Sequence, residues 1–178
     1  MRWVATILCL LAGLILPHGA ALAVNSGNAL PTRNRGIITG LPLPRFVSLR
    51  SSVVNVRRGP GQRYPIDWVY HRRGLPVQII WEFETWRQVR MRDGTTGWIH
   101  QALLSGQRSF VVSAPEAVLR DQPNPGGQVV ARLRQGVIGR LRRCRAASAW
   151  CQVATHGFSG FVRRAAIWGS FPGEAVGG

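Results

Sequence analysis

Two cysteines, Cys144 and Cys151, have the spacing that most directly predicts a chemical bond in this sequence. Cys144 ends a strand-like stretch, and Cys151 begins the next one after the loop 145–149, so a hairpin would bring the two thiols together. In an oxidising compartment such a pair forms a disulfide. The rival interpretation is a thiol nucleophile or a metal site that uses His156, but one histidine and two cysteines make an incomplete set with no established zinc spacing. We predict a Cys144–Cys151 disulfide and no metal site.

The histidines and carboxylates show no pattern typical of catalysis. Outside the N-terminal segment the histidines are His71, His100 and His156. None of them belongs to a nucleophile–base–acid arrangement, and no spacing of carboxylates indicates the pair that a glycosidase uses. Glu82 and Glu84 lie beside Arg87, which predicts an exposed cluster of ion pairs that stabilises the fold little. We expect no catalytic residue, no cofactor and no enzymatic activity.

Aromatic side chains are the stronger indication of a binding role. Five of them lie close together in the sequence: Trp68, Tyr70, Trp81, Trp86 and Trp98. A flat aromatic surface with arginine at its rim suits sugar rings or a peptide, although the same rings could instead cover the core or a contact between domains. The candidate ligand-binding residues are Trp86, Trp98, Tyr64, Tyr70 and Arg57. Three later aromatic residues are expected to pack at a contact between domains: Trp150, Phe161 and Trp168.

Short strands must position these side chains. Strand-like stretches occur in the first half at residues 53–56, 66–70, 77–83, 86–92 and 96–99. Asp93-Gly94 is a hairpin turn signal between the last two. Five short strands in about 60 residues have the size of a small β-barrel. A domain of this size buries only about 60% of its surface when it folds, so we expect a second domain to pack tightly against it.

The second half of the chain repeats the first. Residues 86–89 (Trp-Arg-Gln-Val) match residues 150–153 (Trp-Cys-Gln-Val), and residues 97–99 (Gly-Trp-Ile) match residues 160–162 (Gly-Phe-Val). Five such matches have offsets between 62 and 64 residues. Offsets this steady predict two copies of one domain, and two copies are too few for a solenoid.

Residues 1–23 are typical of a secretory signal peptide. Arg2 supplies the positive charge, residues 3–16 form an apolar run that is short for a membrane span, and residues 21–23 (Ala-Leu-Ala) form a cleavage site. A lipid anchor at Cys9 fits poorly because no small residue precedes this cysteine, and an uncleaved anchor is the other alternative. We expect export to the periplasm or the extracellular space, with residues 24–44 as a flexible linker.

The charge of the chain is strongly positive. It has 23 basic residues, all of them arginine, against 7 acidic ones, which gives a net charge of +16. A basic surface attracts anionic polymers, carboxylate-bearing wall or lipid headgroups. A genome rich in G and C would also favour arginine over lysine, although it would not explain the shortage of acidic residues. Because the chain is expected outside the cytoplasm, we do not expect nucleic acid as a partner, and we expect no membrane-spanning segment after the signal.

The first copy resembles a bacterial SH3 domain. The resemblance lies in residues 55–61 (Asn-Val-Arg-Arg-Gly-Pro-Gly) and residues 94–99 (Gly-Thr-Thr-Gly-Trp-Ile). The second copy is similar more loosely, because residues 121–123 (Asp-Gln-Pro) replace the glycine loop and Phe161 replaces the closing tryptophan. The resemblance extends over about residues 46–168, and the two-copy arrangement is similar to a family of secreted bacterial proteins with no assigned catalytic role.

This resemblance implies an all-β protein with two tandem SH3-like barrels, at residues 45–106 and 107–170, followed by a tail at residues 171–178. Bacterial SH3 domains usually direct proteins to the cell wall. The resemblance therefore implies an exported, non-catalytic binding module of the cell envelope that recognises peptidoglycan or a wall peptide, with anionic envelope polymers as further partners. The alternative is an accessory subunit that binds another envelope protein.

Overall fold

The computed structural model describes residues 34–177. The predicted signal peptide (1–23) and residues 24–33 of the predicted linker lie outside the described residues. Within the described part, no helix has the length and apolar character that a membrane crossing requires.

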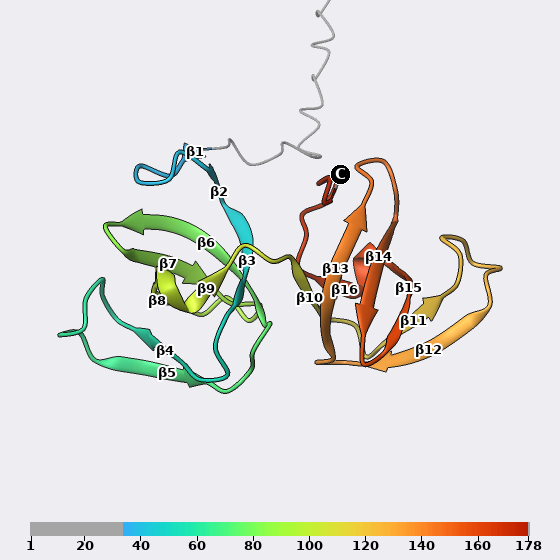
Figure 1. Ribbon diagram of the computed structural model, residues 1–178, viewed down its shortest axis with the longest axis horizontal. Coiled ribbons are helices and arrows are strands. Elements are labelled where there is room, and N and C mark those ends of the chain that lie inside the picture. Colours follow the sequence, from blue (N-terminus) through green and yellow to red (C-terminus); the bar gives the residue numbers. More distant parts are fainter. Residues whose placement is uncertain (1–33, 178) are drawn as a thin grey trace, which may run out of the picture. The chain divides into compact units, whose positions relative to one another are not determined.

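Copy one consists of seven strands in a single sheet, coloured blue to yellow in Figure 1. The strands are β3 (Arg45–Leu49), β4 (Val54–Arg57), β5 (Ile66–Tyr70), β6 (Pro76–Phe83), β7 (Trp86–Arg90), β8 (Thr96–His100) and β9 (Leu104–Ser105). They are hydrogen-bonded in the order β5-β4-β8-β7-β6-β3-β9. A 3₁₀ helix, η1 (Gln101–Leu103), precedes the last strand.

Copy two has the same number of strands, coloured yellow to red in Figure 1. The strands are β10 (Ser109–Val112), β11 (Glu116–Arg120), β12 (Val129–Arg134), β13 (Ile138–Cys144), β14 (Trp150–Thr155), β15 (Phe158–Arg163) and β16 (Ile167–Trp168), with η2 (Arg164–Ala166) before β16. Their order, β12-β11-β15-β14-β13-β10-β16, repeats that of copy one strand for strand. The predicted all-β fold of two tandem barrels is therefore confirmed.

Alternation along each strand separates a buried face from an outward one. In β4, Val54 and Val56 are buried while Asn55 and Arg57 are only half-buried, as the period of a strand requires. Close strand crossings are made possible by glycine: a β-carbon at Gly97 in β8 would collide with the side chain of Val56. The core of copy one gathers the buried apolar residues of its strands, and copy two repeats this arrangement around its own core.

The end of the predicted linker is an ordered part of the first copy. Strands β1 (Asn34–Arg35) and β2 (Pro42–Leu43) pair antiparallel, and Leu43 is buried in the core of copy one. The predicted flexible lead-in up to residue 44 is therefore wrong for its last part. The difference arises because the turn between these strands binds a buried carboxylate, a long-range contact that no local pattern indicates.

That carboxylate belongs to Glu82 of β6, which is only 1% exposed. It accepts hydrogen bonds from the backbone N–H groups of Ile38 (3.0 Å) and Thr39 (2.9 Å), from the Thr39 hydroxyl (2.7 Å) and from Arg45 (2.7 Å). Arg87 of β7 is also buried, and its Nε atom lies 3.8 Å from Oε1 of Glu82, the oxygen that Arg45 contacts. The prediction of an exposed ion-pair cluster at residues 82–87 is therefore wrong for Glu82, which the turn 36–41 covers, and for Arg87, whose guanidinium is buried against Glu82, Gln101 and the carbonyls of Glu84 and Trp86.

The predicted disulfide is confirmed: Cys144 at the end of β13 is bonded to Cys151 in β14, with 4.4 Å between the Cα atoms. Both cysteines are buried in the core of copy two. Val176, in the segment expected as a tail, is also buried there and exchanges two backbone hydrogen bonds of 2.9 Å with Cys144. The chain after β16 is thus folded against copy two as far as Gly177.

Aromatic rings join the two copies, which belong to one compact unit. Phe46 of β3 makes an edge contact with Trp168 of β16, with 4.9 Å between the ring centroids. The ring centroid of Phe171 lies 4.7 Å from that of Phe46. Arg108, in the connection between the copies, stacks over the Phe46 ring at 5.7 Å. The expectation that Trp168 packs at a contact between domains is confirmed.

Candidate functional site

The outward face of the sheet β4-β8-β7-β6 carries a row of side chains in cross-strand register. Trp98 of β8 lies between Arg57 of β4 and Gln88 of β7, and Gln88 in turn pairs with Trp81 of β6. Trp81 is 51% exposed, while the other three are half-buried. Since facing residues in an antiparallel pair have β-carbons about 5 Å apart, this row forms a continuous surface of two indole rings separated by an amide.

A second row runs beside the first. Trp86 of β7 pairs with Phe83 of β6 on one side and His100 of β8 on the other. The Trp86 ring meets His100 edge-on at 5.4 Å, and only 8% of Trp86 is exposed. Trp86 therefore supports this face from within, whereas the exposed ring of Phe83 extends it.

Arg57 and Tyr64 shape the loop at the end of the first row. The Arg57 guanidinium donates to the carbonyl oxygens of Gln62 (3.0 Å) and Tyr64 (2.7 Å). The Tyr64 ring packs directly on Gly59, where any β-carbon would collide with it. This packing explains why the loop needs glycine at that position. Arg57 holds the loop against the sheet, so its role at this site is to position the loop.

Tyr70 lies apart from the other predicted site residues. It lines a separate pocket of about 210 Å³ together with Met91 and Asp93. Burial, together with the negative charge of Asp93, raises the pKa of the Tyr70 hydroxyl. The structure thus brings Trp86, Trp98, Arg57 and Tyr64 to one region and leaves Tyr70 in another.

Copy two presents an equivalent outward face with different chemistry. Phe161 of β15 lies between Arg120 of β11 and Gln152 of β14, and Gln152 pairs with Arg143 of β13. Arg120 donates to the carbonyl oxygen of Gly127, so it holds its loop as Arg57 does in copy one. The row Arg–Trp–Gln–Trp of copy one becomes Arg–Phe–Gln–Arg in copy two.

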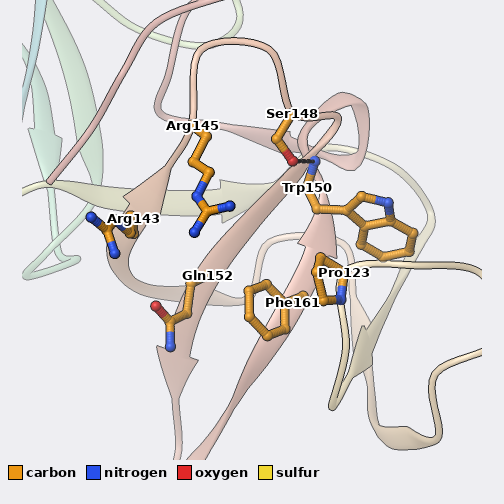
Figure 2. Close-up of a pocket in the computed structure, with 7 residues that line it drawn as sticks. All are labelled: Pro123, Arg143, Arg145, Ser148, Trp150, Gln152 and Phe161. Carbon is orange, nitrogen blue, oxygen red and sulfur yellow. Dashed lines mark hydrogen bonds between the residues drawn. The ribbon is translucent and has the colours of Figure 1, made fainter. Parts of the chain in front are cut away.

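A pocket of about 190 Å³ opens on this face of copy two. Its lining residues are Pro123, Arg143, Arg145, Ser148, Trp150, Gln152 and Phe161. Figure 2 shows the two guanidinium side chains, Arg143 and Arg145, on one side and the rings of Phe161, Pro123 and Trp150 on the other. The loop that carries Arg145 is closed by a hydrogen bond of 3.0 Å from the backbone N–H of Ser148 to the Arg145 carbonyl, and the backbone N–H of Trp150 donates to the Ser148 hydroxyl at 3.1 Å.

Trp150 and Phe161 were expected at a contact between domains, and this prediction is wrong. Both occupy outward positions of β14 and β15, which direct them into the pocket. Arg163 lies over the Trp150 ring at 4.9 Å, in the place that His100 takes beside Trp86 in copy one. The ring of Trp150 is therefore held in place by a cation.

Sequence reasoning missed the outward positions on β6 and β13 as members of this face. The steady offset between the copies contained the signal, because Trp86 and Gln88 match Trp150 and Gln152. Strand pairing then adds the missing partners, Trp81 opposite Gln88 and Arg143 opposite Gln152. The bulge in each β6–β7 or β13–β14 hairpin shifts the register by one residue, which a simple count along the sequence does not anticipate.

Within residues 34–177, no three histidine, cysteine or carboxylate side chains gather closely enough to hold a metal ion. The two outward faces offer stacking, hydrogen bonding and charge. Aromatic rings and an amide dominate copy one, and aromatic rings and guanidinium groups dominate copy two.

A family model agrees with this two-copy architecture. The family model described as "Bacterial SH3 domain" matches residues 50–106 and 113–169. No curated protein matches the chain. Among solved structures, the chain is similar to NlpC1 from Trichomonas vaginalis, with 15% identity, a TM-score of 0.33, and coverage of 70% of this chain and 45% of that one. It is also similar to NlpC2 from the same organism, with 13% identity, a TM-score of 0.33, and coverage of 70% of this chain and 48% of that one.

The chain thus spans less than half the length of either of these two proteins. The two segments that the family model matches contain nearly all of the strands of copy one and copy two. Together they make up more than half of the sequence. The chain belongs to the bacterial SH3 domain family and carries two tandem copies of that domain.

Proposed function

We propose that this chain is an exported, non-catalytic binding module of the cell envelope that recognises peptidoglycan or a wall peptide through the outward face of copy one. The observation that carries the proposal is the row formed by Trp98, Gln88 and Trp81, with Phe83 beside it. An exposed aromatic surface on a rigid sheet binds ligands with little loss of conformational freedom. Domains of this family are often modules that bind the cell wall.

The dimensions of the row suit an extended ligand. Neighbouring strands lie about 4.8 Å apart, so the path from β8 across β7 to β6 is about 10 Å long. An extended peptide advances about 3.3 Å per residue, so about three residues cover the row. Trp81 and Trp98 supply flat apolar surfaces, and the amide of Gln88 supplies a donor and an acceptor between them.

Two further features support a place in the envelope. The buried Cys144–Cys151 disulfide fits an oxidising compartment outside the cytoplasm. The net charge of +16 favours association with the anionic polymers of that compartment.

A second candidate function is that of an accessory subunit bound to another envelope protein. Strand β5 forms an edge of the copy-one sheet and exposes Ile66, Trp68 and Val69. An exposed apolar edge strand can pair with a strand of a partner. This surface lies on a different strand from Trp81, so the two functions can be separated by mutation.

The test is co-sedimentation of residues 24–178 with purified peptidoglycan at low and at physiological salt. Trp81→Ala and Trp98→Ala are expected to weaken binding at least tenfold. Trp68→Ala is the matched control, because Trp68 is 56% exposed against 51% for Trp81 but lies on β5. Wall binding that survives salt and requires Trp81 but not Trp68 supports the proposal.

The opposite pattern would favour the second candidate. If wild-type protein fails to sediment with peptidoglycan, while Trp68→Ala abolishes capture of a defined envelope protein, the chain is an accessory subunit. Binding to peptidoglycan that vanishes at physiological salt and is unchanged in Trp81→Ala would reduce the wall interaction to nonspecific attraction by arginine.

A further inference from the structure

The outward faces of the two copies differ at four equivalent positions, and three of these differences, all except Trp98 to Phe161, add an arginine to copy two. Arg143 stands where copy one has Trp81, because both pair with the glutamine of the neighbouring strand. Arg145 follows Cys144 as Phe83 follows Glu82. Arg163 stands opposite Trp150 where His100 stands opposite Trp86. The aromatic face of copy one is thus matched by a cationic face in copy two.

The two arginines of the copy-two pocket have no acidic partner. All seven carboxylate side chains of the sequence lie in the described part of the chain. Four of them take part in salt bridges, with Arg45, Arg58, Arg87, Arg108 and Arg132, and none reaches Arg143 or Arg145. Both side chains are exposed, so their guanidinium groups are available to an anion from outside.

The size and the lining of the pocket restrict its ligand. Its volume of about 190 Å³ is below the ~300 Å³ at which pockets begin to enclose drug-sized molecules, so it accommodates one part of a larger ligand. One side is cationic and the other consists of the rings of Trp150, Phe161 and Pro123 (Figure 2). A ligand that fills both sides has an anionic group attached to a compact, weakly polar body. A polymer charged along its whole length would leave the ring side unused.

We propose that this pocket binds a carboxylate-bearing unit of the wall ligand, with the carboxylate on Arg143 and Arg145 and the attached sugar or peptide body on Trp150. This inference rests on the proposed function, since it assigns the second copy a different part of the same ligand. Copy one then supplies a neutral aromatic face and copy two an anion subsite. The divergence of copy two thereby broadens the range of groups that one chain recognises.

The test is an NMR titration of the oxidised chain, residues 24–178, that follows the indole N–H signal of Trp150, assigned with Trp150→Phe. The probe is N-acetylmuramic acid, which joins a carboxylate to a sugar. N-acetylglucosamine, which lacks the carboxylate, and inorganic phosphate, which lacks the sugar, are the comparison ligands. Saturable shifts are expected with N-acetylmuramic acid, with at least tenfold weaker binding for the comparison ligands.

The double variant Arg143→Gln/Arg145→Gln is expected to weaken N-acetylmuramic acid binding at least tenfold. Its matched control is Arg132→Gln/Arg134→Gln, which removes the same charge from β12, outside the pocket, and should bind as wild type does. Equal loss in both double variants, equal affinity for phosphate, or no shift with any probe would overturn the inference. This assay uses no peptidoglycan, so a negative titration does not contradict wall binding through Trp81. A negative sedimentation experiment likewise does not contradict ligand binding in the pocket of copy two.

Discussion

Glu82 and Arg87 in copy one occupy the same places as Cys144 and Cys151 in copy two. Each pair sits in register across the equivalent hairpin, β6–β7 or β13–β14, and each pair is buried. One copy fills the place with opposite charges and the other with a covalent bond. The comparison shows that this buried cross-strand position accepts either an ion pair at 3.8 Å or a disulfide.

The two copies also differ in the segment that covers this link. In copy one the turn 36–41, which precedes the barrel, donates backbone hydrogen bonds to Glu82. In copy two the segment that follows the barrel pairs with Cys144 through Val176. The end of β6 is thus covered by the segment that precedes the barrel of copy one. The end of β13 is covered by the segment that follows the barrel of copy two.

Arg45 and Arg108 each have a carboxylate partner, but the partner comes from a different part of each copy. The two arginines hold equivalent positions in the two copies. Arg45 pairs with Ile79 of β6, and the Arg108 carbonyl accepts a hydrogen bond from Leu141, the residue of β13 that corresponds to Ile79. Arg45 contacts the carboxylate of Glu82 at 2.7 Å. Copy two has a cysteine at that place, and the carboxylate for Arg108 comes instead from Glu174 after the barrel, also at 2.7 Å.

The most disruptive change should be Glu82→Ala. It leaves Arg87 buried without its counter-charge and releases the turn 36–41, and removal of one partner from a buried ion pair typically costs about 3–5 kcal/mol. Urea unfolding monitored by tryptophan fluorescence measures the loss. Glu116→Ala breaks the exposed pair with Arg132 and should cost at most about 1 kcal/mol. Equal losses of unfolding free energy in the two variants would show that the buried ion pair stabilises the fold no more than the exposed pair does.

Acid should weaken copy one more than copy two. Burial alone would raise the pKa of Glu82, but the hydrogen bonds from Thr39, Arg45 and Ile38 outweigh it and lower the pKa from 4.5 to about 2. The folded state therefore gains stability from Glu82 that is fully present above pH 4.5 and is lost as the pH falls to about 2.

The size of this acid effect is on the order of 3 kcal/mol, because one pKa unit corresponds to about 1.4 kcal/mol. Urea unfolding at a series of pH values across this window measures it. In Glu82→Gln the glutamine cannot titrate, so its stability should change much less over the same window. A wild-type curve parallel to that of Glu82→Gln would refute the role of this carboxylate.

Loss of the disulfide should have a smaller effect than Glu82→Ala or acid, and it should act on copy two. Its cysteines are separated by seven positions, and closing so short a loop stabilises the fold by about 2–3 kcal/mol in the chain-entropy model. Cys144→Ala/Cys151→Ala should lower the free energy of unfolding by this amount. Wild-type protein treated with reductant provides the independent comparison, and a free thiol in native material analysed by mass spectrometry would contradict the bond.

The two barrels and the disulfide could be predicted from the sequence because their signals are local or repeated. The offset between the copies and the turn residues locate the strands, and a hairpin brings Cys144 and Cys151 together. The burial of Glu82 could not be predicted in this way. Its partners Ile38 and Thr39 are 44 and 43 positions away, and a glutamate at the end of an amphipathic strand has the pattern of a solvated residue.

The candidate site was predictable only in part. Trp86 follows from the repeat and from alternation along its strand, whereas for Trp98 the repeat predicts the strand but alternation leaves its face open. Trp81 and Trp68 could not be distinguished, since both lie in strands and both are exposed, and only strand pairing places Trp81 beside Trp98 through Gln88. The cationic pocket of copy two depends on the same pairing, so it too requires the structure.

The short connection between the copies has a consequence for avidity. Only residues 106–108 separate β9 from β10, so the Cα atoms of Ser105 and Ser109 can be at most about 14 Å apart. If both copies bind the proposed wall polymer, a segment released by one copy remains close to the other. Tethering on this scale corresponds to an effective concentration in the millimolar range, and two individually weak contacts would together give a long residence time on a repeating ligand.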